Sequence, residues 1–132
     1  MRKFPISLLR PVKAVLSGVA GNASMEIGLH SFELNGETVG TSIRLDKIAI
    51  PNITLASLAG LSFRFPVNPE PGYIDGSIYI DHVHHPVDVH QLSCTDTTIS
   101  VSGMLVFEHE GLDDYENTPF SLTAPVESVV RV

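Results

Sequence analysis

Apolar and polar side chains alternate through most of this 132-residue chain, and this period constrains the fold more than any other feature. In the stretch SMEIGL the apolar positions are Met25, Ile27 and Leu29, and the stretches DGSIYI and TTISVSG alternate in the same way. A period of two places successive side chains on opposite faces of a β-strand. Turn signals recur about every ten residues, and no stretch has the pattern of a long amphipathic helix.

Local signals place some of the turns. Asn35-Gly36 interrupts the alternation and is the strongest short hairpin signal in the chain. The apolar phase slips just before Phe32, which predicts a bulge or bend near residues 30–31. A further turn is expected at Asp46-Lys47.

The segment PNITLASLAGLSF is the one place where a helix is expected. Thr54 can cap a single helical turn that stops at Gly60. We therefore predict an all-β protein, an antiparallel β-sandwich or flattened barrel of about eight or nine strands, with at most one short helical turn near residues 54–60.

Size and composition indicate one domain that spans residues 1–132. Hydrophobic residues make up 43% of the chain and charged residues 17%, which is typical of an ordered globular protein. Cys94 is the only cysteine, so no disulfide can form within one chain, and a reducing, cytoplasmic location is expected. We expect its thiol to be partly buried near the end of a strand. No apolar run approaches the length of about 18 residues that a membrane span needs.

Charge is distributed unevenly along the chain. Residues 1–64 hold seven of the eight lysines and arginines and four acidic residues, whereas residues 65–132 hold one arginine and eleven acidic residues. Contacts to phosphate require clustered lysine and arginine, so this distribution argues against binding nucleic acid or anionic lipid. An acidic half of this kind suits a basic protein partner, a cation or the basic half of another copy.

Four of the six histidines lie within the stretch GSIYIDHVHHPVDVHQ. We expect a β-hairpin with its turn at residues 85–88, because Pro86 suits the second position of a β-turn. His82 and His84 would then leave one face of a strand about 7 Å apart, close enough to bind one zinc or iron ion. The candidate metal ligands are His82, His84, Asp88 and His90. The alternative is a structural hairpin whose histidines form hydrogen bonds to neighbouring strands.

The spacing within this hairpin resembles the first motif of the cupins. Five residues separate Gly76 from His82-Val83-His84, and three more separate His84 from Asp88. The resemblance implies a metal held by two histidines and an acid inside a β-barrel, next to a small-molecule site. Aspartate stands where that family has glutamate, and the second motif of the family is absent downstream.

A second candidate surface lies near the C-terminus, in the run EHEGLDDYEN, which contains five carboxylates and no lysine or arginine. It can be a solvated loop, a docking surface for a basic protein or a calcium site, although it lacks the spacing of an EF-hand loop. The residues assigned to a partner surface are Glu108, Glu110, Asp113, Asp114, Tyr115 and Glu116.

Two functions follow from these features. The first is a small, soluble, non-enzymatic interaction domain that forms homodimers and recognises a basic partner with its acidic half, as an inhibitor or immunity-type protein would. The second is a cupin-like barrel in which His82, His84 and Asp88 hold zinc or iron. The first hypothesis needs no cofactor.

Overall fold

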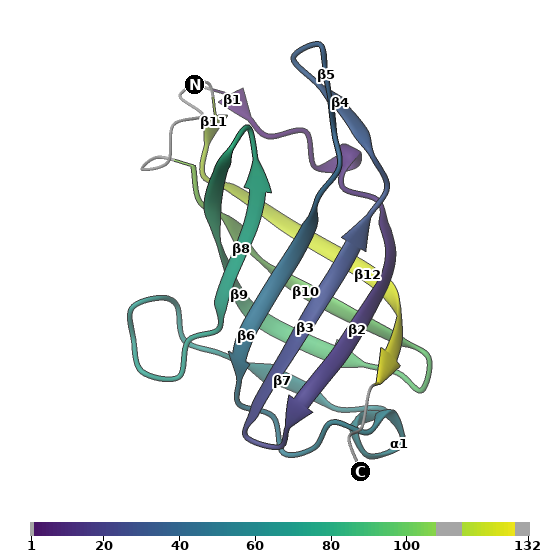
Figure 1. The fold of residues 1–132 in the computed structure, drawn as a ribbon. Helices are drawn as coiled ribbons and strands as arrows, with labels where there is room; N and C mark the ends of the chain where they lie inside the picture. The colour runs from purple at the N-terminus through teal and green to yellow at the C-terminus, as the bar shows by residue number, and fades with distance from the viewer. Residues whose placement is uncertain (1, 108–114, 129–132) are drawn as a thin grey trace.

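The computed structural model describes residues 2–107 and 115–128, and its main strands form a closed seven-stranded barrel (Figure 1). The barrel strands are β2 (Pro11–Val19), β3 (Asn22–Leu29), β6 (Ser42–Ile48), β8 (Asp75–Ile80), β9 (Val83–Cys94), β10 (Thr98–Leu105) and β12 (Thr118–Ser128). Each pairs in antiparallel fashion with the next along the chain, and β12 closes the barrel on β2 in parallel. The parallel pair is required, because strand directions alternate in a meander and an odd number of strands leaves the first and last pointing the same way.

Shorter elements decorate the two ends of the barrel. They are β1 (Arg2–Lys3), the 3-10 helix η1 (Ile6–Leu8), β4 (Phe32–Leu34), β5 (Glu37–Val39), α1 (Leu55–Leu58), β7 (Ser62–Arg64) and β11 (Tyr115–Glu116). β1 pairs with β11, the β4–β5 hairpin projects from the upper end in Figure 1, and α1 lies at the lower end. The predicted all-β fold is therefore confirmed, as a barrel.

Most of the local predictions are also confirmed. Asn35 and Gly36 both have positive φ, 51° and 83°, as a tight hairpin turn requires. Strand β3 ends before residues 30–31 and β4 begins after them, at the predicted irregularity. Thr54 occupies the N-cap position of the helical turn α1, although its side chain makes no capping hydrogen bond, and Gly60 follows that turn with φ 82°.

The turn predicted at Asp46-Lys47 is wrong, because both residues lie inside β6. The register between β3 and β6 shifts here, and Lys47 has φ 60°, so the strand contains a bulge. Ser24 Oγ on the neighbouring strand donates a hydrogen bond of 2.7 Å to Asp46 Oδ1 and helps to hold the bulged segment against β3. The turn signal is local, whereas the pairing of β6 with strands on both sides decides the outcome.

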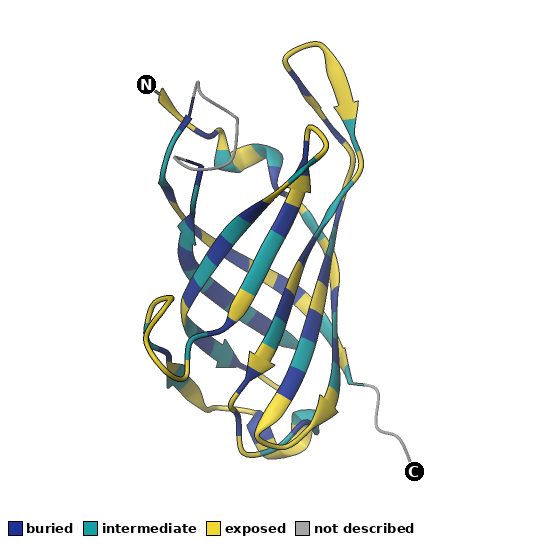
Figure 2. Ribbon diagram, turned by 60° about the vertical axis from the view of Figure 1, so that its left-hand side comes forward, coloured by how far each residue is buried: buried dark blue, intermediate teal, exposed yellow. Residues whose placement is uncertain are grey.

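Alternate side chains of all seven strands fill the inside of the barrel, and Figure 2 shows this as stripes of buried and exposed residues. Fully buried examples are Leu16, Ile43, Ile78 and Val87, each at 0% exposure. Cys94, at the end of β9, is buried as expected, and burial raises the pKa of its thiol.

Aromatic side chains close the upper end of the barrel. The Phe4 ring stacks on Phe107 with centroids 5.4 Å apart and meets the edge of Tyr115 at 5.3 Å and that of Phe32 at 6.4 Å. The backbone N–H of Phe4 donates to Thr118 Oγ1 over 3.0 Å, which fixes the N-terminal segment across this end. Within residues 2–107 and 115–128, no helix has the length and apolar character to cross a bilayer.

Candidate functional site

The histidine hairpin turns at Asp81-His82, so the turn predicted at residues 85–88 is wrong. Both turn residues have positive φ, 54° and 66°, and Ile80 pairs directly with Val83. Pro86 lies within β9, opposite Ser77, and its carbonyl accepts a hydrogen bond from Val106 N at 2.9 Å. The earlier turn keeps the apolar positions of β8 and β9 inside the barrel together, which outweighs the local preference of proline for a turn.

This turn separates the predicted metal ligands. His82 occupies the turn, and His84 lies exposed on the outer face with its ring centroid 4.6 Å from that of Tyr79. Asp88 is half-buried further along β9, and His90 is exposed beyond it. Burial raises the pKa of the Asp88 carboxyl.

Of the histidines in the hairpin, His85 is the one that points inward. It is 0% exposed, its Nε2 lies 3.2 Å from the Ile80 carbonyl oxygen, and its ring contacts Phe107. Among the described residues, no group of three or more histidine, cysteine, aspartate or glutamate side chains is placed to hold a metal ion. The cupin-like alternative thus lacks its ligand set within this part of the chain.

Part of the predicted partner surface, Glu108, Glu110, Asp113 and Asp114, lies outside the described residues. Tyr115 is 2% exposed and belongs to the aromatic closure, with the Arg2 guanidinium 4.9 Å above its ring. Glu116 is half-buried and pairs with Lys3 in the β1–β11 ladder. Tyr115 thus serves as an internal anchor rather than as an exposed contact.

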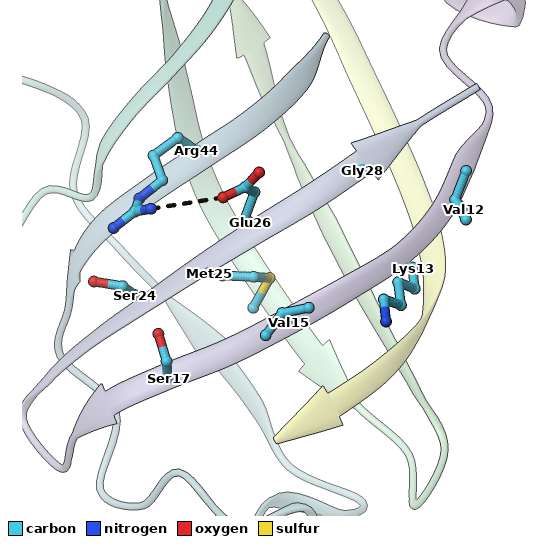
Figure 3. A pocket seen from close by; sticks show the side chains of 9 residues that line it. All are labelled: Val12, Lys13, Val15, Ser17, Ser24, Met25, Glu26, Gly28 and Arg44. Carbon is cyan, nitrogen blue, oxygen red and sulfur yellow. Dashed lines mark ion pairs between the residues drawn. The ribbon is translucent and has the colours of Figure 1, made fainter. Parts of the chain in front are cut away.

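A groove that the sequence did not predict crosses the outer face of β2, β3, β6 and β8. Figure 3 shows the part of it that lies over β2, β3 and Arg44 of β6. Strand register arranges its side chains in rows across the wall. One row runs through Val15, Glu26, Arg44 and Ser77. The next row along the strands contains Lys13, Gly28 and Ser42 and continues to the Tyr79–His84 pair.

Small residues explain why this wall is hollow. Gly28 lies on the floor where two adjoining depressions of about 490 and 460 Å³ meet, and the two also share Glu26 and Arg44. Ser17 and Ser24 are directly paired further along the strands, beyond the Val15–Glu26 pair. Long side chains rise around this floor, so the groove results from a difference in side-chain length on one sheet surface.

The charged groups of the groove are paired. Arg44 Nη1 lies 3.6 Å from Glu26 Oε2 and its Nη2 lies 3.3 Å from Asp46 Oδ1, while Lys13 Nζ lies 3.0 Å from Glu127 Oε2. Partial burial by itself would raise the pKa of Asp46, but hydrogen bonds from Ser24 and Arg44 and the charges of Arg44 and Lys47 outweigh it, so the pKa is lowered.

The fold and site define a closed meandering barrel with a filled interior and a polar groove on its outer wall. No protein-family model, no curated protein and no solved structure significantly matches this chain. The function of this protein must therefore be inferred from its own side chains and their geometry. The outward serines and Gly28 can be read from the sequence alternation, but their assembly into one groove depends on register, which the alternation does not give.

Proposed function

We propose that this protein is a small non-enzymatic interaction module that binds a basic protein partner through the acidic run at residues 108–116. One observation carries the proposal. Two buried aromatic residues, Phe107 at 1% and Tyr115 at 2% exposure, flank residues 108–114 of this run, and their ring centroids are 5.7 Å apart. A binding segment that is anchored at both ends loses less conformational entropy when a partner binds.

Exposed acids from other elements support the same end of the barrel as the recognition surface. Glu37 and Asp81 line one depression of about 150 Å³ beside the tips of two hairpins, and Glu33 is exposed on β4 nearby. Arg2 lies at this end as well, but its guanidinium packs over Tyr115. Clustered carboxylates would accelerate the encounter with a basic partner and discriminate against acidic ones.

The remaining parts of the proposal follow from the sequence. We place the protein in the cytoplasm, without nucleic-acid or membrane partners and without a cofactor, and we propose that it forms a homodimer. The seven barrel strands have no free edge, so we propose the outer face of β10 as the contact surface. Light scattering that gives the mass of one chain at micromolar concentration would contradict the dimer but leave the acidic surface untouched.

A charge-matched pair of variants tests the acidic surface. The first variant neutralises four of the five acids of the run with Glu108→Gln, Glu110→Gln, Asp113→Asn and Asp114→Asn. The control carries Glu70→Gln, Asp75→Asn, Asp96→Asn and Glu127→Gln, which change the net charge equally on other parts of the chain. Pull-down at low salt should retain a basic protein on the wild type and on the control but lose it on the first variant. Equal retention by all three would refute the proposal.

A further inference from the structure

We propose that the groove on the outer wall is a binding site for a neutral saccharide, separate from the acidic end of the barrel. Three features of the groove support this ligand: an exposed aromatic ring, a row of polar groups beside that ring, and charged side chains that are all paired.

Tyr79 supplies an aromatic platform. It is a large side chain that is 44% exposed near the end of β8, and it borders the depression that contains Ser42, Ser77 and Arg44. The His84 ring lies against it with a centroid distance of 4.6 Å and an angle of 50°, which restricts its orientation. A sugar ring presents an apolar face of C–H groups, and the electron-rich face of a tyrosine ring suits that surface.

The groups beside the platform suit the rim of a sugar. Ser42 and Ser77 supply hydroxyls, while Glu26 and Arg44 supply planar acceptors and donors on neighbouring strands. Ser42 Oγ already donates to Glu26 Oε1 over 3.3 Å, so the polar groups form a connected set that is open to solvent on one side. A ligand with hydroxyls around its edge can exchange hydrogen bonds with all of them.

Charge pairing selects a neutral ligand. Arg44 contacts both Glu26 and Asp46, and Lys13 contacts Glu127. A charged ligand would meet groups of both signs that already have a counter-charge, whereas an uncharged ligand can bind beside these ion pairs and leave them intact. The groove spans two adjoining depressions, which gives room for more than one sugar unit.

NMR titration of the full-length, isotope-labelled protein tests the site. The probes are five neutral hexasaccharides, built from α-glucose, β-glucose, β-xylose, β-mannose and N-acetylglucosamine units, each added to about 10 mM, the range of weak binding. At least one should give saturable shifts at the amides of Ser42, Ser77 and Tyr79. The absence of saturable shifts with all five, or shifts confined to the opposite wall, would overturn the proposal.

Substitutions then separate stacking from unspecific contact. Tyr79→Ala should weaken binding at least about tenfold, whereas Tyr79→Phe, which keeps the ring, should stay within about threefold of the wild type. Gly28→Ile should block the groove without unfolding the barrel, because an added Cβ meets only Lys13 O at 3.8 Å. Ser121→Ile, an exposed position on β12, is the matched control and should bind normally.

Two results would refute the assignment even if a sugar binds. The first is equal affinity of wild type, Tyr79→Ala and Gly28→Ile. The second is binding of an acidic hexasaccharide such as hexagalacturonate in preference to every neutral one. Loss of a protein partner in Gly28→Ile, without binding of any saccharide, would instead assign the groove to protein recognition.

Discussion

The two outer walls of the barrel differ although they share one interior. The wall formed by β2, β3, β6 and β8 is grooved and carries ion pairs such as Arg44–Glu26. On the opposite wall, the outward residues of β10 are Thr98, Ser100, Ser102 and Met104, all uncharged. Ser93, Ser100 and Thr123 form one row of hydroxyls across β9, β10 and β12 there, and Ser100 and Thr123 are joined by a 2.8 Å hydrogen bond.

This difference shows that a charge asymmetry along a sequence need not become an asymmetry between faces. The acidic second half of the chain contributes an almost uncharged wall. Among its described acids, Glu70, Asp81 and Asp96 lie in loops or turns, whereas Asp88 is half-buried within β9. The basic first half supplies the wall with the paired charges, where Arg44 pairs with two acids of its own half and Lys13 pairs with Glu127 of the second half.

The largest contrast concerns one glycine on the inner face of β10, Gly103, and one on the outer face of β3, Gly28. An added Cβ at Gly103 would lie 1.8 Å from the Asp88 carbonyl oxygen, whereas at Gly28 the nearest atom is 3.8 Å away. Gly103→Ala should therefore lower the free energy of unfolding by about 3 kcal/mol or more, and Gly28→Ala should change it by less than about 1 kcal/mol. Urea unfolding measures both. Similar values would mean that β9 and β10 do not approach each other this closely.

Removal of a buried methylene group should lower the free energy of unfolding equally on the inner faces of the two walls. Ile43 on β6 is 0% exposed and Ile99 on β10 is 1% exposed. Ile43→Val and Ile99→Val each remove one buried methylene-sized group, and each should cost about 1 kcal/mol in thermal or urea unfolding. A cost confined to one of them would show that one wall is loosely packed, and the walls would then differ inside as well as outside.

The ionised carboxylates of two aspartates, Asp46 and Asp88, should have opposite effects on the free energy of unfolding at neutral pH. The pKa of Asp46 is lowered by its bonds to Ser24 and Arg44, so its ionised form stabilises the fold above the ordinary pKa, and this contribution disappears as the pH falls through the lowered value. Burial raises the pKa of Asp88, so its ionised form destabilises the fold at neutral pH, and this penalty disappears as the pH falls below the ordinary pKa.

At pH 7, Asp46→Asn should therefore be less stable than the wild type, by about 1 kcal/mol or less, and Asp88→Asn should be more stable. Both differences should shrink toward acid pH, which unfolding curves at several pH values would reveal. If Asp88→Asn were destabilising at neutral pH, its carboxylate would have a favourable contact in the folded protein, contrary to this interpretation.

The smallest expected effects are the coupling free energies of one side-chain pair on each wall, and these two should differ in their sensitivity to salt. Double-mutant cycles on Lys13–Glu127, whose side chains are 57% and 61% exposed, and on Ser100–Thr123 should each give a coupling of about 0.5 kcal/mol or less. The first coupling should vanish in about 1 M NaCl, whereas the second should not change, because a hydrogen bond between hydroxyls is not screened. A salt-sensitive Ser100–Thr123 coupling would contradict the uncharged character of its wall.

Sequence reasoning reached the class of fold and several local features because these depend on neighbours in the chain. The tight turn at Asn35-Gly36 and the helical turn after Thr54 follow from local backbone preferences. The turn at Asp81-His82 was missed because its signal is weak and Pro86 offered a stronger one nearby. Only the pairing of Ile80 with Val83 and the shared interior favour the earlier turn.

The candidate sites also depend on strand pairing, which local sequence signals do not reveal. The cluster of histidines along the chain suggested a metal site at His82, His84, Asp88 and His90, yet the turn lies at Asp81-His82, so His82 is in the turn and the other three are spread along β9. The groove around Gly28 was missed, because its residues come from strands that the sequence separates by many positions. Nothing local shows that Glu26 lies opposite Arg44.

The sequence by itself determined that this chain forms short strands with one buried face, since the alternation of its side chains leaves no other way to remove the apolar ones from water. Tertiary structure alone decided that the sheet closes as a seven-stranded barrel, which strands lie side by side, and which outward residues meet in one groove. The physical reason is that alternation fixes the face on which a side chain lies, whereas register and closure are decided by packing between strands that are distant in sequence.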